Sequence, residues 1–269
     1  MKVKLEDSTE QPKSYRVDEI RVVRSGKEMS NNYKVKLGQL DQIDTDELVK
    51  KAIDGAKEKL GGEVAPTGQY PVVFSPEAMS DLLGVFSGIF SSEAAQKGLS
   101  KLAGKEGTVI AGENVTLIDD PFHEKKFGHC PFDAEGVAVY TKSVIDDGVL
   151  KTLLYNRMYA KKFDTETTGN ATSAKGIGVT GLYLKPGELT EEELLQKLGD
   201  GLYITGLQGL HAGVNAVSGD FSLQASGFLV EDGNIDFTSM TVDGGVYGKG
   251  DWVETTIDGE KYYYATTPY

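Results

Sequence analysis

The sequence of 269 residues is poor in the side chains that build disulfides and metal sites, with one cysteine and three histidines. A single cysteine excludes an internal disulfide framework and favours a reducing compartment, so we expect a cytoplasmic protein. No run approaches the roughly 20 apolar residues of a membrane-spanning helix. The opening stretch "MKVKLEDSTEQPKSY" has no apolar core of the kind a signal peptide needs.

Basic residues are also few: 28 Lys and Arg stand against 41 Asp and Glu, which gives a formal net charge of −13. Such a charge repels nucleic acid and anionic membrane surfaces unless a local basic patch overrides it. The densest basic stretch, 151–162, holds only four scattered basic residues. We therefore expect a solvated surface there, and neither a nucleic-acid nor a membrane partner.

The chain has 33 glycines but only 8 prolines. So many glycines predict many tight turns and close backbone approaches. Segment 44–61 reads as a helix that Asp44 or Thr45 can cap. The helix after "YPVVF", capped by Ser75 and Pro76, is apolar nearly all round and should be buried. Hairpin signals follow at Asp147-Gly148, Asp232-Gly233 and Asp258-Gly259. A short helix with a capping box begins at Thr190.

Because helices and strands segregate along the chain rather than alternate, the sequence predicts an α+β fold. We expect mainly antiparallel β-sheets, curved or barrel-like, with a few packed helices. The sequence shows no internal repeat and no low-complexity linker.

The most enzyme-like stretch is "PFHEKKFGHCPFD", which holds His123, Glu124, His129 and Cys130. Two histidines six positions apart do not share a helix face, and prolines and glycine interrupt the segment. A loop could still gather these donors around zinc, as a hydrolase would need. The simpler interpretation is a polar surface loop, so we predict no metal here and keep the zinc hydrolase as an alternative.

Six stretches follow one another in a distinctive order: "PTGQYPVVFSPEAMSDLLG", "LIDDP", "CPFDAEGV", "YNRMYAKKFDTETTGNA", "VTGLYLKPGELTEEELLQKLGDGLYITGL" and "GVNAVSGDFSLQASGFLVEDGNI". By these stretches the chain resembles the TldD/PmbA family, also described as modulator of DNA gyrase. The resemblance runs in consistent order over about 13–242.

This resemblance implies paired subunits in a metallopeptidase system for proteolysis and peptide maturation. TldD-type members carry zinc on a helical HExxxH motif, whereas PmbA-type members (TldE) lack the motif and serve as partner subunits. The two histidine positions correspond to about Leu83 and Gly88 here, and neither residue can bind metal. The resemblance therefore implies a PmbA-like, non-catalytic subunit without a cofactor of its own, and zinc only in a TldD-like partner.

The segment that we expect to hold an extended peptide or partner subunit is glycine-rich, since glycine lets another backbone approach. The candidate residues are Asn215, Gly219, Asp220, Phe221 and Ser222, although "SGDFS" could equally be a turn and strand that pack the sheet. The expected partners are a TldD-like subunit or a second copy in a homo-oligomer, and a peptide substrate. A purely structural oligomerisation module is a further alternative.

Two departures from the family pattern concern domain organisation. We expect a single PmbA/TldD-type C-terminal domain over 1–269, with the family's N-terminal α/β domain absent. The usual final strand is replaced after Met240, so we expect a divergent tail over 243–269.

Overall fold

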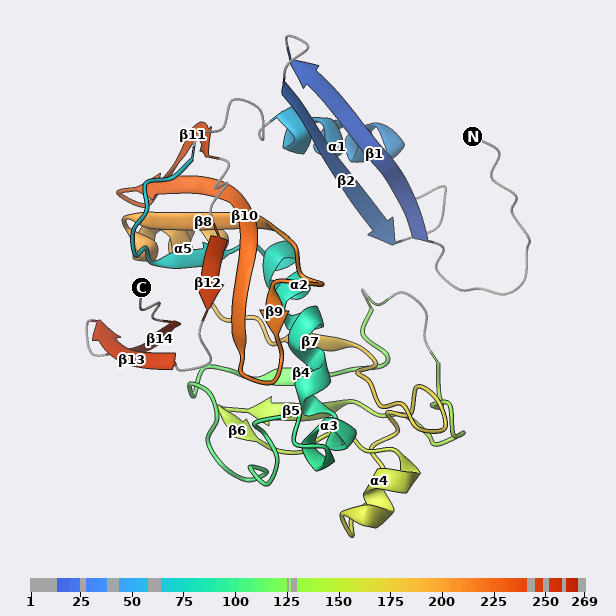
Figure 1. Cartoon of the computed structure of the whole chain (residues 1–269). Coiled ribbons are helices and arrows are strands. Elements are labelled where there is room, and N and C mark those ends of the chain that lie inside the picture. The colour runs from blue at the N-terminus through green and yellow to red at the C-terminus, as the bar shows by residue number, and fades with distance from the viewer. Residues whose placement is uncertain are drawn as a thin grey trace. The chain divides into compact units, whose positions relative to one another are not determined.

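The computed structural model describes residues 14–24, 28–37, 44–57, 64–124, 126, 130–240, 245–248, 252–257 and 260–265. The described elements fall into two compact units. Strands β1 and β2 and helix α1 form the first unit, and all later elements belong to the second (Figure 1).

The first unit is a long antiparallel hairpin with one helix packed against it. The predicted helix is confirmed, and its predicted cap is present because the Asp44 carboxylate accepts a hydrogen bond from the Glu47 N–H at 2.9 Å. An exposed Lys51–Glu47 pair one turn apart adds little stability. The elements are β1 (Ser14–Arg24), β2 (Glu28–Leu37) and α1 (Thr45–Lys57).

The larger sheet of the second unit runs in the order β11-β10-β8-β3, with β9 and β12 also paired to β10. All of these pairs are antiparallel except β3 with β8. Helix α5 covers part of this sheet, where buried Leu195 packs with side chains of β8 and β10. The strands are β3 (Val72–Phe74), β8 (Gly201–Gln208), β9 (Val214–Asn215), β10 (Asp220–Glu231), β11 (Asn234–Met240) and β12 (Gly245–Gly248).

A smaller antiparallel sheet has the order β6-β5-β4-β7. A further hairpin pairs β13 with β14, and its turn at Asp258-Gly259 lies outside the described residues. The strands are β4 (Leu117–Asp119), β5 (Lys142–Asp146), β6 (Val149–Leu150), β7 (Leu182–Leu184), β13 (Trp252–Ile257) and β14 (Glu260–Ala265).

Two predicted hairpin turns are confirmed, since the β5–β6 and β10–β11 connections are Asp-Gly turns. Asp147 and Gly148 have φ values of 46° and 76°, and Asp232 and Gly233 have 49° and 74°. Both positions of each turn therefore lie in the left-handed region that this hairpin type requires. The antiparallel sheets and few helices confirm the predicted α+β class.

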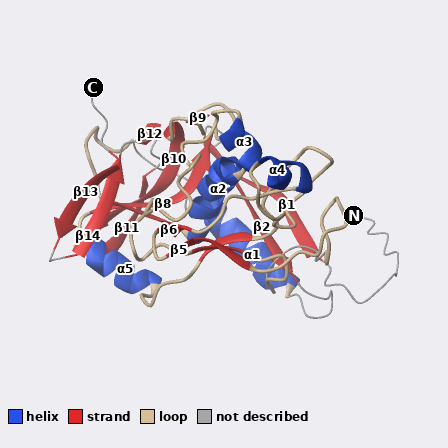
Figure 2. Cartoon of the chain, turned by 90° about the horizontal axis from the view of Figure 1, so that it is seen from below, coloured by secondary structure: helices blue, strands red, loops and turns tan. Residues whose placement is uncertain are grey.

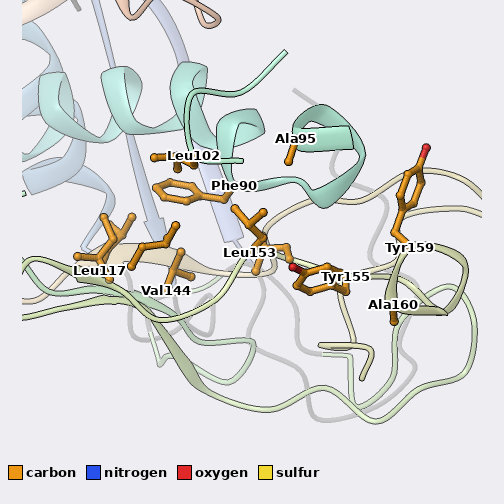
Figure 3. Close-up of a cluster of buried hydrophobic side chains, with 12 residues drawn as sticks. Phe90, Ala95, Leu102, Leu117, Val144, Leu153, Tyr155, Tyr159 and Ala160 are labelled. Carbon is orange, nitrogen blue, oxygen red and sulfur yellow. The ribbon is translucent and has the colours of Figure 1, made fainter. Parts of the chain in front are cut away.

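The main core lies between the helices after β3 and the smaller sheet (Figure 3). Phe90 and Leu102 face Leu117 and Val144 of this sheet, and Leu153 continues the cluster toward Tyr155. Figure 2 shows α2, α3 and α4 close together, away from α5. The helices of the second unit are α2 (Pro76–Phe86), a 3-10 turn (Ser87–Phe90), α3 (Ser92–Gln96), α4 (Arg157–Lys162) and α5 (Glu191–Leu198).

Candidate functional site

Helix α2 starts at a fixed point of the larger sheet. The Ser75 hydroxyl accepts a hydrogen bond from the Ala78 N–H at 3.2 Å, and Pro76 takes the first turn, so the predicted cap is confirmed. The Ser75 N–H also donates to the Ile204 carbonyl of β8 at 2.8 Å. Any group on α2 is therefore held in a defined place relative to β8.

The prediction that this helix is buried is wrong. Of its residues only Ala78 is buried, and one face is open to solvent. The exposed positions repeat at intervals of three or four residues, which places them on a single stripe. Polar Glu77, Ser80 and Asp81 lie on this stripe, and its glycines add no apolar side chain that would need burial. It consists of Glu77, Ser80, Asp81 and Gly84, and Gly88 continues it into the 3-10 turn.

The two glycines of this open face have room above them. A methyl group built on Gly84 or on Gly88 would meet nothing within 4 Å. Neither residue therefore serves to let another part of this chain pack closely. At Gly84 and Gly88 a second chain could therefore approach the helix backbone closely.

A zinc ion does not fit the place that the family motif would give it. Leu83 packs against the main core, and Gly88 has no side chain. The helix segment 82–92 contains no histidine, cysteine, aspartate or glutamate. The described residues 64–124, 126 and 130–235 contain no group of three such side chains that could hold a metal.

The predicted binding segment forms the β9–β10 hairpin. Its turn is held locally, because the Asn215 carboxamide oxygen accepts the Val217 and Ser218 N–H groups at 3.0 and 3.2 Å. The Asn215 carbonyl accepts the Gly219 N–H at 2.8 Å, and Gly219 has a φ of 82°. Val217 at the tip is 41% exposed. The segment is thus a rigid turn that presents its tip to solvent.

Strand β10 has neighbours on both sides directly after this turn. Phe221 is paired with Val214 of β9 and with Gly248 of β12, and Ser222 is paired with Tyr247. A peptide cannot add to the backbone of these two residues without displacing β12. Binding at this hairpin must therefore use its turn and side chains, and the role predicted for the five residues stays a prediction.

Helix α2 and the hairpin meet at two aromatic rings, on the side of the helix away from the open face. Phe86 at the end of α2 and Phe221 at the start of β10 lie edge to face, with centroids 6.2 Å apart and planes at 67°. Such pairs stabilise by about 0.5–1.5 kcal/mol beyond their area. The helix that the family resemblance singles out and the predicted binding segment are therefore adjacent.

The histidine and cysteine cluster is not gathered into a site by the described residues. Glu124 and Cys130 are exposed, and the Cys130 thiol donates to the Phe132 carbonyl at 2.9 Å. The His123 ring lies against Tyr183, with centroids 4.7 Å apart. His129 lies outside the described residues. The His123 ring and the Cys130 thiol thus contact different groups.

The most connected buried polar group is the Asp119 carboxylate, whose side chain is fully buried. One oxygen accepts hydrogen bonds from the Thr180 N–H and hydroxyl and from the Gly181 N–H, at 2.7, 2.9 and 2.8 Å. The other accepts from the Asn170 amide at 2.7 Å and from the Lys142 ammonium at 3.3 Å. Burial raises the pKa of Asp119, but hydrogen bonds from the Gly181 and Thr180 N–H groups and the Asn170 amide, with the attraction of Lys142, together outweigh it and hold the pKa below its usual value.

The Lys142 side chain of this network is almost fully buried. Burial lowers the pKa of Lys142, and attraction to Asp119 offsets only part of that shift. Asp119 and Asn170 belong to the family stretches "LIDDP" and "TTGNA", but the sequence predicted no role for either residue. The one indication of a polar network in the sequence is that both stretches contain polar residues. The network ties the two stretches together inside the smaller sheet.

Comparisons with known proteins identify the family of this chain. The family model "PmbA/TldA metallopeptidase C-terminal domain" matches residues 67–248. A metalloprotease of Methanothermobacter thermautotrophicus is 36% identical over 206 residues, which are 73% of this chain and 44% of that protein. Metalloprotease PmbA of Escherichia coli O157:H7 is 29% identical over 223 residues, 81% of this chain and 48% of that protein. The chain belongs to the TldD/PmbA family.

Solved structures show the same fold. A protein of Thermotoga maritima, described as a candidate modulator of a DNA gyrase, superposes with a TM-score of 0.78 and 37% identity. That match covers 83% of this chain and 52% of the other. TldE of Thermococcus kodakarensis has a TM-score of 0.72 at 24% identity, over 92% of this chain and 59% of the other. The chain spans about half the length of the curated relatives it matches.

The predicted domain, 1–269, is longer than the segment 67–248 that the family model matches. The single domain over 1–269 and the absence of the family's N-terminal domain stay predictions. Much of the predicted divergent tail, 243–269, lies outside the described residues. The described residues contain no helix long and apolar enough to cross a membrane.

Proposed function

We propose that this protein is a non-catalytic, PmbA-like subunit of a TldD/PmbA-type peptidase system. The observation that carries the proposal is the open face of α2. This helix occupies the place where the resemblance puts the metal ligands of TldD-type members, and its exposed face offers Glu77, Ser80, Asp81 and two glycines instead. Such a face suits recognition of another chain better than hydrolysis.

The proposed binding surface joins two elements. The stripe from Glu77 to Gly88 supplies one exposed helix face, and the tip of the β9–β10 hairpin supplies exposed Val217. The contact between Phe86, on the other side of α2, and Phe221 fixes the helix and the hairpin relative to each other. The occupant is an extended peptide or the matching face of a TldD-like subunit, and zinc belongs to that subunit. The composition supports a cytoplasmic location for this work.

The test fills the open face without disturbing the fold. Gly84→Leu adds bulk where nothing lies within 4 Å, and leucine favours a helix over glycine by about 1 kcal/mol. We expect the melting temperature to stay the same or to rise. Binding to a TldD-type subunit that carries HExxxH, measured by surface plasmon resonance, should weaken at least tenfold.

A matched control adds the same bulk elsewhere. Gly187 also has nothing within 4 Å of an added methyl group, but it lies in the loop before α5. Gly187→Leu should leave binding unchanged, and Val217→Glu should weaken it as Gly84→Leu does. Unchanged binding by both Gly84→Leu and Val217→Glu would exclude this surface.

A further inference from the structure

One polar atom of the Asp119 network has an unmet hydrogen-bonding capacity. Asn170 is 1% exposed, and its carboxamide oxygen, Oδ1, accepts no hydrogen bond from the described residues. The orientation of this carboxamide is fixed, because its nitrogen donates to the Asp119 carboxylate at 2.7 Å and to the Gly178 carbonyl at 3.0 Å. A reversed carboxamide would set its oxygen against these two acceptors. Oδ1 is therefore the atom that needs a donor.

Such an atom is unusual in a protein interior, and it calls for a partner. Buried side-chain polar atoms are nearly always paired, either with a protein group or with an ordered water. Among the described residues only two buried side-chain atoms are unpaired, Asn170 Oδ1 and the Asn156 amide nitrogen. Of these two residues, only Asn170 is hydrogen-bonded to Asp119.

The Lys142 ammonium is a second group of this network with unused capacity. It donates to Asp119 Oδ2 at 3.3 Å and lies 4.6 Å from the centroid of the Tyr140 ring. An ammonium carries three N–H donors, so these two contacts leave one N–H unused. The Lys142 side chain is 6% exposed, and bulk solvent therefore reaches little of it.

The unpaired acceptor and the unused donor are neighbours. The Asn170 amide nitrogen and the Lys142 ammonium bind the same carboxylate oxygen, Asp119 Oδ2, at 2.7 and 3.3 Å. Asp119 lies on β4 and Lys142 on β5, so the two groups meet where these strands adjoin the segment that carries Asn170. The ammonium does not bind Oδ1 directly. A small molecule between them would satisfy both.

The chemistry of the two groups defines this molecule. It must donate to Oδ1 and accept from the ammonium, so it needs both a donor and an acceptor. A cation would meet the Lys142 ammonium, and an anion would meet the Asn170 oxygen beside the Asp119 carboxylate. The molecule must also be small, because all three residues are more than nine-tenths buried. We propose that one ordered water bridges Asn170 Oδ1 and Lys142 Nζ and completes the Asp119 network.

This water site is independent of the partner binding proposed above, because it lies inside the second unit. It gives β5 a second link to Asn170, besides the carboxylate oxygen that Lys142 and Asn170 share. Because its partners are buried, the water leaves only when the network opens. It should therefore stay bound far longer than a water on the protein surface.

A crystal structure of the wild-type chain that resolves ordered waters tests the site directly. We expect a water about 2.7–3.2 Å from both Asn170 Oδ1 and Lys142 Nζ. Density that shows no water in contact with Oδ1 would overturn the proposal. A protein donor in contact with Oδ1 would overturn it as well.

Magnetic relaxation dispersion of water oxygen-17 tests the same site in solution, because it counts long-lived internal waters. Lys142→Met removes the donor and keeps the packing of the stem, so the count should fall by one. The control Lys175→Met alters an exposed lysine of the 172–176 loop and should leave the count unchanged. Melting temperatures verify that both variants are folded. An unchanged count in folded Lys142→Met would exclude Lys142 as a partner of the water.

Discussion

At the scale of single residues, the Asp119 carboxylate organises the smaller sheet. It accepts five hydrogen bonds from four residues that lie between 23 and 62 positions away along the chain. A buried carboxylate with this many donors is fully satisfied, whereas removal of its charge leaves the donors unpaired. Loss of one member of a buried ion pair costs roughly 3–5 kcal/mol when the remaining charge is left uncompensated, as the Lys142 ammonium would be without Asp119.

Asp119→Asn should therefore destabilise the protein by about 3–5 kcal/mol. The new amide would place its own N–H groups against the Asn170 amide and the Lys142 ammonium, which are donors as well. Lys142→Met keeps the packing of the stem and removes a single donor, so its cost should be smaller, about 1–2 kcal/mol. Urea unfolding of both variants measures the difference, and equal costs would contradict this account.

The same carboxylate predicts how stability depends on pH. Because the pKa of Asp119 is lower in the folded than in the unfolded chain, its contribution is complete above about pH 4, the usual pKa of aspartate. It is lost as the pH falls through the folded pKa. Wild-type stability should drop more steeply below about pH 4 than that of Asp119→Asn. Parallel curves for the two proteins would exclude this role.

At the scale of elements, turns and caps decide where strands and helices end. In the β5–β6 hairpin, Gly148 has a φ of 76° and also lies close to another backbone. A methyl group there would collide with the carbonyl oxygens of Ala111 and Gly112. This glycine thus permits both the turn and the packing of the neighbouring 107–112 segment, which hydrogen-bonds to the hairpin through the Ile110 N–H and the Gly148 carbonyl at 2.8 Å.

We expect Gly148→Ala to be more destabilising than the same change at Gly136. Gly136 has a similar φ of 73°, but nothing lies within 4 Å of an added methyl group. The backbone cost alone is about 1–2 kcal/mol, and only Gly148→Ala adds the collision. Denaturant midpoints of the two variants compare these costs directly. A similar loss in both would show that the 107–112 segment can move aside.

At the scale of the whole molecule, the chain retains the family fold while the expected metal position holds leucine and glycine. The alternative of a zinc hydrolase would instead need His123, Glu124, His129 and Cys130 to share one ion. Glu124 and Cys130 are exposed, and His123 lies on Tyr183. The described members therefore give no closed shell for a structural ion, whose removal would destabilise the fold.

Purified protein should accordingly contain far less than one zinc ion per chain by elemental analysis. A chelator should change neither the melting temperature nor the rate at which an alkylating reagent modifies Cys130. The double variant His123→Ala with His129→Ala should behave like the wild type in both measurements. A stoichiometric ion that this variant loses would establish the hydrolase alternative instead.

The features that the sequence by itself determined are those that short-range interactions hold in place. Ser75, Thr190 and Asp44 were predicted as caps, and each accepts a backbone N–H three residues ahead. Two of the three predicted Asp-Gly turns are confirmed, because the left-handed conformation is a property of the residues themselves. The family stretches gave the fold and implied the absence of metal ligands on α2.

Only the tertiary structure decided which side of α2 is covered and which residues far apart in sequence meet. The helix was expected to be buried, but Glu77, Ser80, Asp81 and two glycines form one open face. Pairing of β10 with both β9 and β12 leaves no free backbone at Phe221, which belongs to the predicted binding segment. The donors around Asp119 come from distant segments, and their meeting depends on sheet register, which no local pattern encodes.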